Sequence, residues 1–151
     1  MADGTGRKAF NSWILIETLL VTGLLISLYY SYIVEYEIEC GCIIGKGLYL
    51  SYIMEYSKIF GVRAIDLSVA GFLAGSLLGM LAILGIQLCR KILILGALVA
   101  AIILIPYYIY LEISLGFICI YCSALQMITV AVGALLFSIF LEMMKRHKAY
   151  S

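Results

Sequence analysis

Four long apolar stretches constrain the fold of this chain more than any other feature, and they cover about residues 13–34, 64–88, 92–114 and 117–141. Each has the roughly 20 residues that an α-helix needs to cross the hydrocarbon core of a bilayer. Hydrophobic residues make up 65% of the chain, above the about 45–50% that is usual in soluble domains. The sequence therefore predicts an all-α membrane protein, a four-transmembrane-helix bundle that forms one integral membrane domain over residues 1–151.

Basic residues near the ends of the apolar stretches predict the orientation of the bundle. Seven of the ten Lys and Arg residues precede the first stretch, separate the second from the third or follow the fourth, namely Arg7, Lys8, Arg90, Lys91, Lys145, Arg146 and Lys148. The opposite face carries Lys46, Lys58 and Arg63 together with several glutamates. We therefore expect a multi-pass protein of the cell membrane with both termini in the cytoplasm.

The connections between the stretches differ greatly in length. Residues 89–91 and a few residues around Gly116 are the expected links of two tight helical hairpins. The long connection, residues 35–63, is rich in Ile, Leu, Tyr and Phe with charged residues interspersed. We expect it to form a short amphipathic helix in the first extracytoplasmic loop, at the interface or capping the bundle. A re-entrant or aromatic-belt segment is the alternative.

Four of the five cysteines are predicted to meet at the extracytoplasmic face. Cys119 and Cys122 begin the fourth stretch with the spacing of thioredoxin-type redox motifs, which places both thiols on one helix face near the N-terminus. The helix dipole stabilises a thiolate there. Cys40 and Cys42 follow the first stretch, and Gly41 between them supplies the backbone freedom that so small a disulfide ring needs. Such a disulfide would be strained and therefore prone to exchange.

The chain carries two stretches, YLEISLGFICIYC at residues 110–122 and YSKIFGVRAIDLSVAGFLAG at residues 56–75, that resemble the vitamin K epoxide reductase family. The first is similar to the start of that family's fourth helix, and the second to the beginning of its second helix. The resemblance implies a bundle that holds a quinone beside the thiol pair, with Cys122 facing the quinone. It also implies that Cys119 exchanges with a loop pair, whose role Cys40 and Cys42 match at a closer spacing.

The resemblance also implies a reaction and its partners. Prokaryotic members of the family use a membrane quinone to make disulfide bonds for a secreted thioredoxin-fold protein, and a chain of this length resembles them. We therefore expect electrons to pass from such a partner through Cys40/Cys42 and Cys119/Cys122 to a quinone of the ubiquinone or menaquinone type. Vitamin K epoxide is not inferred as the substrate. The net charge of +1 gives no reason to expect nucleic acid, and we expect a monomer in the lipid bilayer.

Few polar residues within the apolar stretches could contact a quinone. Gln126, one turn beyond the thiol pair, could bond a quinone oxygen or a neighbouring helix. Asp66 could serve the quinone or a proton path, or could cap its helix near Arg63. Glu17 and Glu112 are interpreted as interfacial or interhelical, although acids inside a membrane are functional candidates by default.

Two other interpretations of the cysteines remain open from the residues themselves. The Cys-x-Cys and Cys-x-x-Cys pairs supply four thiolates, enough for a tetrahedral zinc or a soft-metal site. The chain could also be a structural protein with four spans and incidental cysteines, as we interpret Cys89. The family resemblance favours the redox interpretation, so no metal site is predicted.

Overall fold

The computed structural model describes residues 3–36, 43–45, 58–59, 61–115 and 117–149. These residues contain four long helices, α1 (Asp3–Glu35), α3 (Ala64–Ile83), α4 (Gln87–Leu115) and α5 (Ile120–Ala149). Each includes a segment long and apolar enough to cross a membrane, namely Asn11–Glu35, Ala64–Ile83, Gln87–Ser114 and Ile120–Glu142. The predicted set of four potential membrane spans is therefore confirmed.

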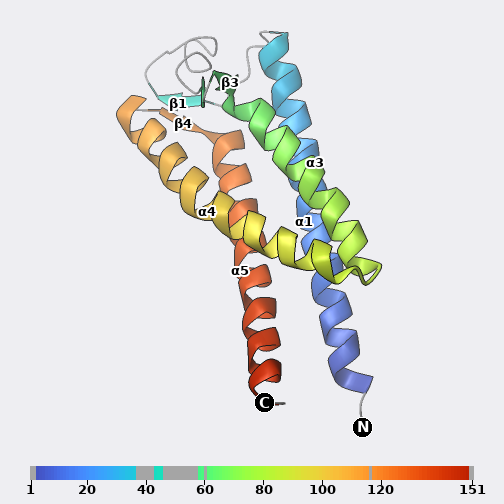
Figure 1. The fold of residues 1–151 in the computed structure, drawn as a ribbon. Helices are drawn as coiled ribbons and strands as arrows, with labels where there is room; N and C mark the ends of the chain where they lie inside the picture. The colour runs from blue at the N-terminus through green and yellow to red at the C-terminus, as the bar shows by residue number, and fades with distance from the viewer. Residues whose placement is uncertain (1–2, 37–42, 46–57, 60, 116, 150–151) are drawn as a thin grey trace.

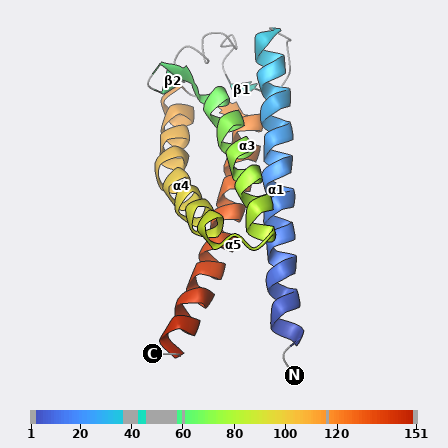
Figure 2. The same ribbon diagram turned by 45° about the vertical axis from the view of Figure 1, so that its right-hand side comes forward.

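The helices form a bundle in which each helix has two main neighbours. α1 packs against α3 and α5, and α4 packs against the same two helices. Both chain termini lie at one end of the bundle, which we call the terminal end (Figure 1). The opposite end, the strand end, carries the short strands β1 (Ile43–Gly45) and β4 (Phe117–Cys119) (Figures 1 and 2). The thiol pair is thus at the end of the bundle away from the termini.

Two buried clusters fill the interior. The cluster nearer the terminal end contains Trp13, Ile16, Leu20, Ala82, Leu93, Ile94, Val132 and Leu136. The cluster nearer the strand end contains Tyr30, Ile65, Cys119 and Leu125. The outward faces carry many exposed large apolar side chains, such as Leu25, Leu95 and Ile102. Helices that are apolar on all sides are typical of membrane spans, where lipid covers the outer face.

Small residues on α3 let α1 approach closely. A Cβ on Gly75 would come within 3.1 Å of Leu20 Cδ2, and a Cβ on Gly79 would overlap the carboxylate of Glu17. The same carboxylate accepts a hydrogen bond from Ser76 Oγ at 2.5 Å. Glu17 is therefore an interhelical residue, one of the two placements predicted for it.

The turn between α3 and α4 lies earlier than predicted, so the expected link at residues 89–91 was wrong. α3 ends at Ile83, and the chain reverses at Gly85, which has a φ of +97°. The backbone N–H of Ile86 donates to the carbonyl of Leu81 at 3.2 Å, as in a Schellman motif. Apolar residues continue through this turn, so hydropathy alone did not locate it, and residues 89–91 lie in the first turns of α4.

The start of the fourth span also differs from the prediction. Helix was expected from residue 117, but Phe117–Cys119 form β4, and α5 begins at Ile120. β4 pairs antiparallel with β1, and Cys119 lies opposite Ile43 in the register. A second short pair joins β2 (Lys58–Ile59) to β3 (Val62–Arg63). Pairing with a distant segment, which a local pattern does not reveal, therefore displaced the helix start by three residues.

The amphipathic helix predicted within residues 35–63 falls largely on residues 46–57, which lie outside the described residues. The parts of this connection that are described form short strands rather than helix. The described fold is therefore a bundle of four long helices with two small two-stranded sheets, rather than purely helical.

Candidate functional site

The thiol pair lies at the junction of β4 and α5. Cys119 is the last residue of the strand and is fully buried, whereas Cys122 lies in the first turn of α5 and is half-buried. The backbone N–H of Cys122 donates to Cys119 Sγ at 3.4 Å. The sulfur thus occupies the position of a helix N-cap acceptor, where free N–H groups and the helix dipole favour negative charge. The predicted location of the pair at a helix N-terminus is confirmed.

Tyr30 contacts the buried sulfur from α1. The Cys119 thiol donates to Tyr30 Oη at 3.4 Å, and Tyr30 is only 2% exposed. Its ring stacks on Tyr121, with 5.2 Å between the ring centroids and 26° between the planes. The sequence analysis missed this residue. Tyr30 is one of 12 tyrosines and is 89 residues from Cys119 in the chain, so no local pattern singles it out.

The surroundings of Cys119 favour its thiolate. Once Cys119 is deprotonated, its sulfur accepts hydrogen bonds from the Cys122 thiol, the Tyr30 hydroxyl and the backbone N–H groups of Tyr121 and Cys122. These bonds lower the pKa of Cys119 to about 6 against the opposing effect of burial. A thiolate is the nucleophile in thiol–disulfide exchange. The surroundings of Cys119 therefore favour the thiolate form, which can attack a disulfide or leave from one.

A cavity of about 320 Å³ begins at Cys122 and extends along the bundle. Its wall includes Tyr30 at the strand end and Leu93 and Val132 toward the terminal end, so it connects the two buried clusters. α4 contains Pro106 and is bowed where it forms one side of the bundle (Figure 2). Most of the wall is apolar, as in sites for small apolar ligands.

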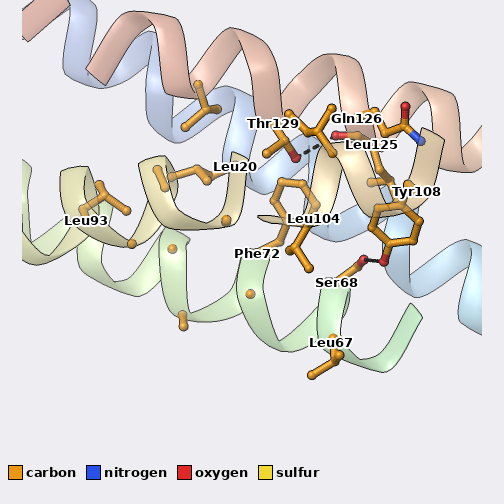
Figure 3. Close-up of a pocket in the computed structure, with 18 of the residues that line it drawn as sticks. Leu20, Leu67, Ser68, Phe72, Leu93, Leu104, Tyr108, Leu125, Gln126 and Thr129 are labelled. Atoms are coloured by element: carbon orange, nitrogen blue, oxygen red, sulfur yellow. Dashed lines mark hydrogen bonds between the residues drawn. The ribbon is translucent and has the colours of Figure 1, made fainter. Parts of the chain in front are cut away.

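The polar side chains of the cavity wall differ in whether their hydrogen bonds are already formed. Ser68 and Tyr108 each donate to the Ala64 carbonyl, at 3.1 and 3.2 Å, and their oxygens are 3.5 Å apart (Figure 3). Thr129 donates to a carbonyl of its own helix at 2.8 Å. Gln126 also lines the cavity, and its Nε2 is buried with no partner among the described residues. Gln126 therefore has a donor available to a bound molecule.

Asp66 is engaged by Arg63. Its two carboxylate oxygens accept from Arg63 Nε at 2.8 Å and Nη2 at 3.2 Å, and Glu35 at the end of α1 accepts from Nη1 at 3.1 Å. These bonds, chiefly that from Asp66, raise the pKa of the Arg63 guanidinium. Asp66 is not among the residues that line the cavity. The structure therefore places Asp66 in an ion pair that joins α1 to α3, apart from the thiol pair and Gln126.

Glu112 brings an acid close to the thiol pair. Its half-buried carboxyl lies beside the backbone of Cys119 and the hydroxyl of Ser123. One of its oxygens, Oε1, is buried without a partner among the described residues. Glu112 thus lies between α4 and α5, one of the two placements predicted for it.

The remaining cysteines are placed differently. Cys40 and Cys42 lie outside the described residues, so their predicted roles are not tested, while Cys89 is half-buried in the first turn of α4. No group of three or more His, Cys, Asp or Glu side chains that could hold a metal occurs within the described part of the chain. The alternative of a four-thiolate metal site also needs Cys40 and Cys42, which lie outside the described residues.

Comparison of this chain with protein families, with characterised proteins and with solved structures finds no match. The function must therefore be argued from the site itself. That site consists of a thiol pair at a helix N-terminus with one sulfur fully buried, a tyrosine hydrogen-bonded to that sulfur, and an apolar cavity that begins at the other cysteine.

Proposed function

We propose that this chain is a membrane thiol–disulfide oxidoreductase that passes electrons from a thioredoxin-fold partner to a membrane quinone. The observation that supports this most is the position of Cys122 in the wall of the apolar cavity. Its volume of about 320 Å³ falls within the roughly 300–1,000 Å³ of known small-molecule sites. The unpartnered Nε2 of Gln126 in the same wall could donate to a quinone carbonyl.

The proposed reaction converts the reduced Cys119–Cys122 pair and a quinone into a disulfide and a quinol. Cys122 is the thiol that reacts with the quinone because it lines the cavity, and Cys119 then closes on it. The two sulfurs lose two electrons, the quinone gains them, and the two thiol protons complete the quinol. The N-terminus of α5 stabilises the thiolate that the exchange requires.

Electrons enter, in this proposal, through the Cys40/Cys42 pair. Cys42 is joined by a peptide bond to Ile43, whose Cα is paired with that of Cys119 across the β1–β4 ladder. The pairing of the described residue Ile43 with Cys119 supports exchange between this loop and the buried sulfur. A reduced partner dithiol would be oxidised by the loop disulfide, and the loop thiols would then reduce Cys119–Cys122 through a mixed disulfide. The resemblance to the vitamin K epoxide reductase family supports the same order.

The proposed orientation places the strand end outside the cytoplasm and the terminal end inside. Seven basic residues fall at the chain termini and at the start of α4, and short basic segments are retained on the cytoplasmic side. Disulfide bonds persist in the compartment beyond the membrane. The thiol pair would then face that compartment.

Quinol formation under anaerobic conditions tests the proposal. The purified protein is mixed with a reduced thioredoxin-fold protein and with ubiquinone or menaquinone, and quinol absorbance is followed in wild type and in Cys122→Ala. We expect quinol from wild type and none from Cys122→Ala, whereas Cys89→Ala, a change at the other end of α4 from the thiol pair, should leave the rate unchanged. No quinol from wild type with either quinone, or stoichiometric zinc or copper bound by its thiols, would count against the proposal.

A trapped mixed disulfide would identify whether Cys40 or Cys42 is the loop thiol that exchanges with Cys119. Replacement of the resolving cysteine leaves the attacking thiol joined to Cys119. A Cys119-containing adduct in Cys40→Ala but not in Cys42→Ala would identify Cys42 as the exchanging thiol. The reverse pattern would identify Cys40.

A further inference from the structure

Apart from Cys122, Tyr30 is the one polar side chain among the described residues that both hydrogen-bonds to the buried sulfur of Cys119 and lines the cavity. Its hydroxyl oxygen accepts the hydrogen bond from the Cys119 thiol at 3.4 Å. Its O–H hydrogen remains available for a second bond, because a hydroxyl both accepts and donates. Tyr30 therefore links the sulfur that does not line the cavity to the space in which a quinone would be reduced.

We propose that Tyr30 is a catalytic proton carrier, whose hydroxyl takes the proton of the Cys119 thiol and passes its own proton to a quinone oxygen as the disulfide closes. This inference rests on the proposed quinone reduction and names a residue for it. The need for a carrier follows from burial, since Cys119 is fully buried and water has no direct access to its proton.

The step balances in atoms and electrons. Both S–H bonds break, the S–S bond between Cys119 and Cys122 forms, and two electrons pass to the quinone. The Cys119 proton moves to Tyr30 Oη while the Tyr30 hydroxyl proton moves to one quinone oxygen. The Cys122 proton goes to the other quinone oxygen, so that quinol is released and Tyr30 is neutral again.

The other groups around Cys119 are less suited to this role. α5 contributes Tyr121, which stacks on Tyr30, and Cys122, which is itself oxidised. α4 contributes Glu112, whose carboxyl lies beside the Cys119 backbone and does not line the cavity. α3 contributes the apolar Ile65 to the cluster around the sulfur. Among these described neighbours, Tyr30 is therefore the one group able to carry a proton that reaches both the thiol and the cavity without being oxidised.

The variant Tyr30→Phe tests the carrier because it keeps the ring that stacks on Tyr121 and removes only the hydroxyl. The full chain is reduced, freed of reductant and mixed with a short-chain ubiquinone in a single anaerobic turnover at pH 5, where the Cys119 thiol, with its pKa of about 6, still carries its proton. Loss of a positioned acid–base group slows such steps by about 10²-fold or more, which is the decrease expected here. The matched control is Tyr29→Phe, a neighbouring exposed tyrosine that also contacts the Tyr121 ring, and its rate should equal that of wild type.

A second measurement separates a proton carrier from a packing residue. The titration of Cys119 is followed against pH by the NMR chemical shift of its labelled Cβ, which needs no reagent to reach the buried sulfur, with an expected midpoint near pH 6 in wild type. Removal of the Tyr30 hydroxyl should move this midpoint upward by about one pH unit, because the thiolate loses a donor. If Tyr30→Phe does not fold, site-specific 3,5-difluorotyrosine at position 30 keeps the O–H and should shift the pH dependence of the quinone step downward.

The outcomes separate this inference from the proposed function. Wild-type rates in Tyr30→Phe, or a slow rate with an unchanged Cys119 titration midpoint, would overturn the carrier and leave quinone reduction in place. If difluorotyrosine at position 30 left the pH dependence of the quinone step unchanged, the carrier would likewise be overturned and quinone reduction would stay in place. Absence of quinol from wild type would instead reject the proposed function, and the carrier with it.

Discussion

At the scale of single residues, the interior of this bundle contains few polar groups, and their hydrogen bonds distinguish their roles. Ser68 and Tyr108 share the Ala64 carbonyl, so their donors are already used. The buried Nε2 of Gln126 has no partner among the described residues, and such a donor costs about 1–3 kcal/mol. A molecule in the cavity that offers a carbonyl oxygen would remove this cost, which makes Gln126 the residue expected to orient a quinone.

Gln126→Leu is expected to weaken quinone binding without destabilising the fold. Loss of one hydrogen bond, with a net contribution of about 0.5–1.5 kcal/mol, corresponds to a rise in KM for the quinone of about 2–10-fold. The free energy of unfolding should stay equal or increase, since an unpartnered buried amide is removed. Steady-state quinol formation and denaturant unfolding in detergent measure the two quantities. Thr129→Val, which removes a hydroxyl bonded within its own helix, should leave KM unchanged, and an unchanged KM in Gln126→Leu would contradict the role.

At the scale of elements, the two helix boundaries beside the thiol pair and between α3 and α4 are set by backbone pairing. β4 ends at Cys119 because its partner β1 pairs with residues 117–119, and α5 can begin only after that ladder. α3 ends where Gly85 adopts a positive φ and lets the chain reverse into α4. In both cases one backbone feature decides where an apolar stretch changes direction.

Gly85→Ala is expected to destabilise the bundle through this turn. A residue with a Cβ at a φ of +97° costs about 1–2 kcal/mol, so the free energy of unfolding should decrease by that amount. Gly71→Ala is the matched control, because Gly71 lies inside α3 and a Cβ there meets open space. Unfolding in a mixed detergent titration compares the two. Equal stability of Gly85→Ala and wild type would show that the turn tolerates a side chain.

At the scale of the whole molecule, the chain termini and the thiol pair are separated along the bundle. The chain termini lie at one end of the bundle, and the thiol pair lies near the other (Figure 1). The cavity extends from the thiol pair toward the terminal end, so a lipid-soluble oxidant would be held inside the bundle while a soluble reductant would approach the strand end. In the proposed function, one small chain would thus join two substrates of opposite solubility.

Reporter fusions test the orientation of the molecule. Green fluorescent protein fused after Ser151 should fluoresce and alkaline phosphatase fused there should be inactive, because both chain termini are predicted to be cytoplasmic. The same reporters inserted within residues 46–57 should give the opposite result. An active phosphatase at the C-terminus would place the thiol pair on the cytoplasmic side and would reject a role in making disulfides outside the cell.

The number of spans and the placement of Cys119 and Cys122 at the start of the fourth were predictable from the sequence alone. Hydropathy is summed over about 20 residues of a span, so this signal survives errors of several residues at each end. The contact between Tyr30 and Cys119, the free donor of Gln126 and the β1–β4 ladder were decided only by the tertiary structure. Each depends on how a helix is rotated against its neighbours or on pairing between distant segments, and no local pattern of residues records either.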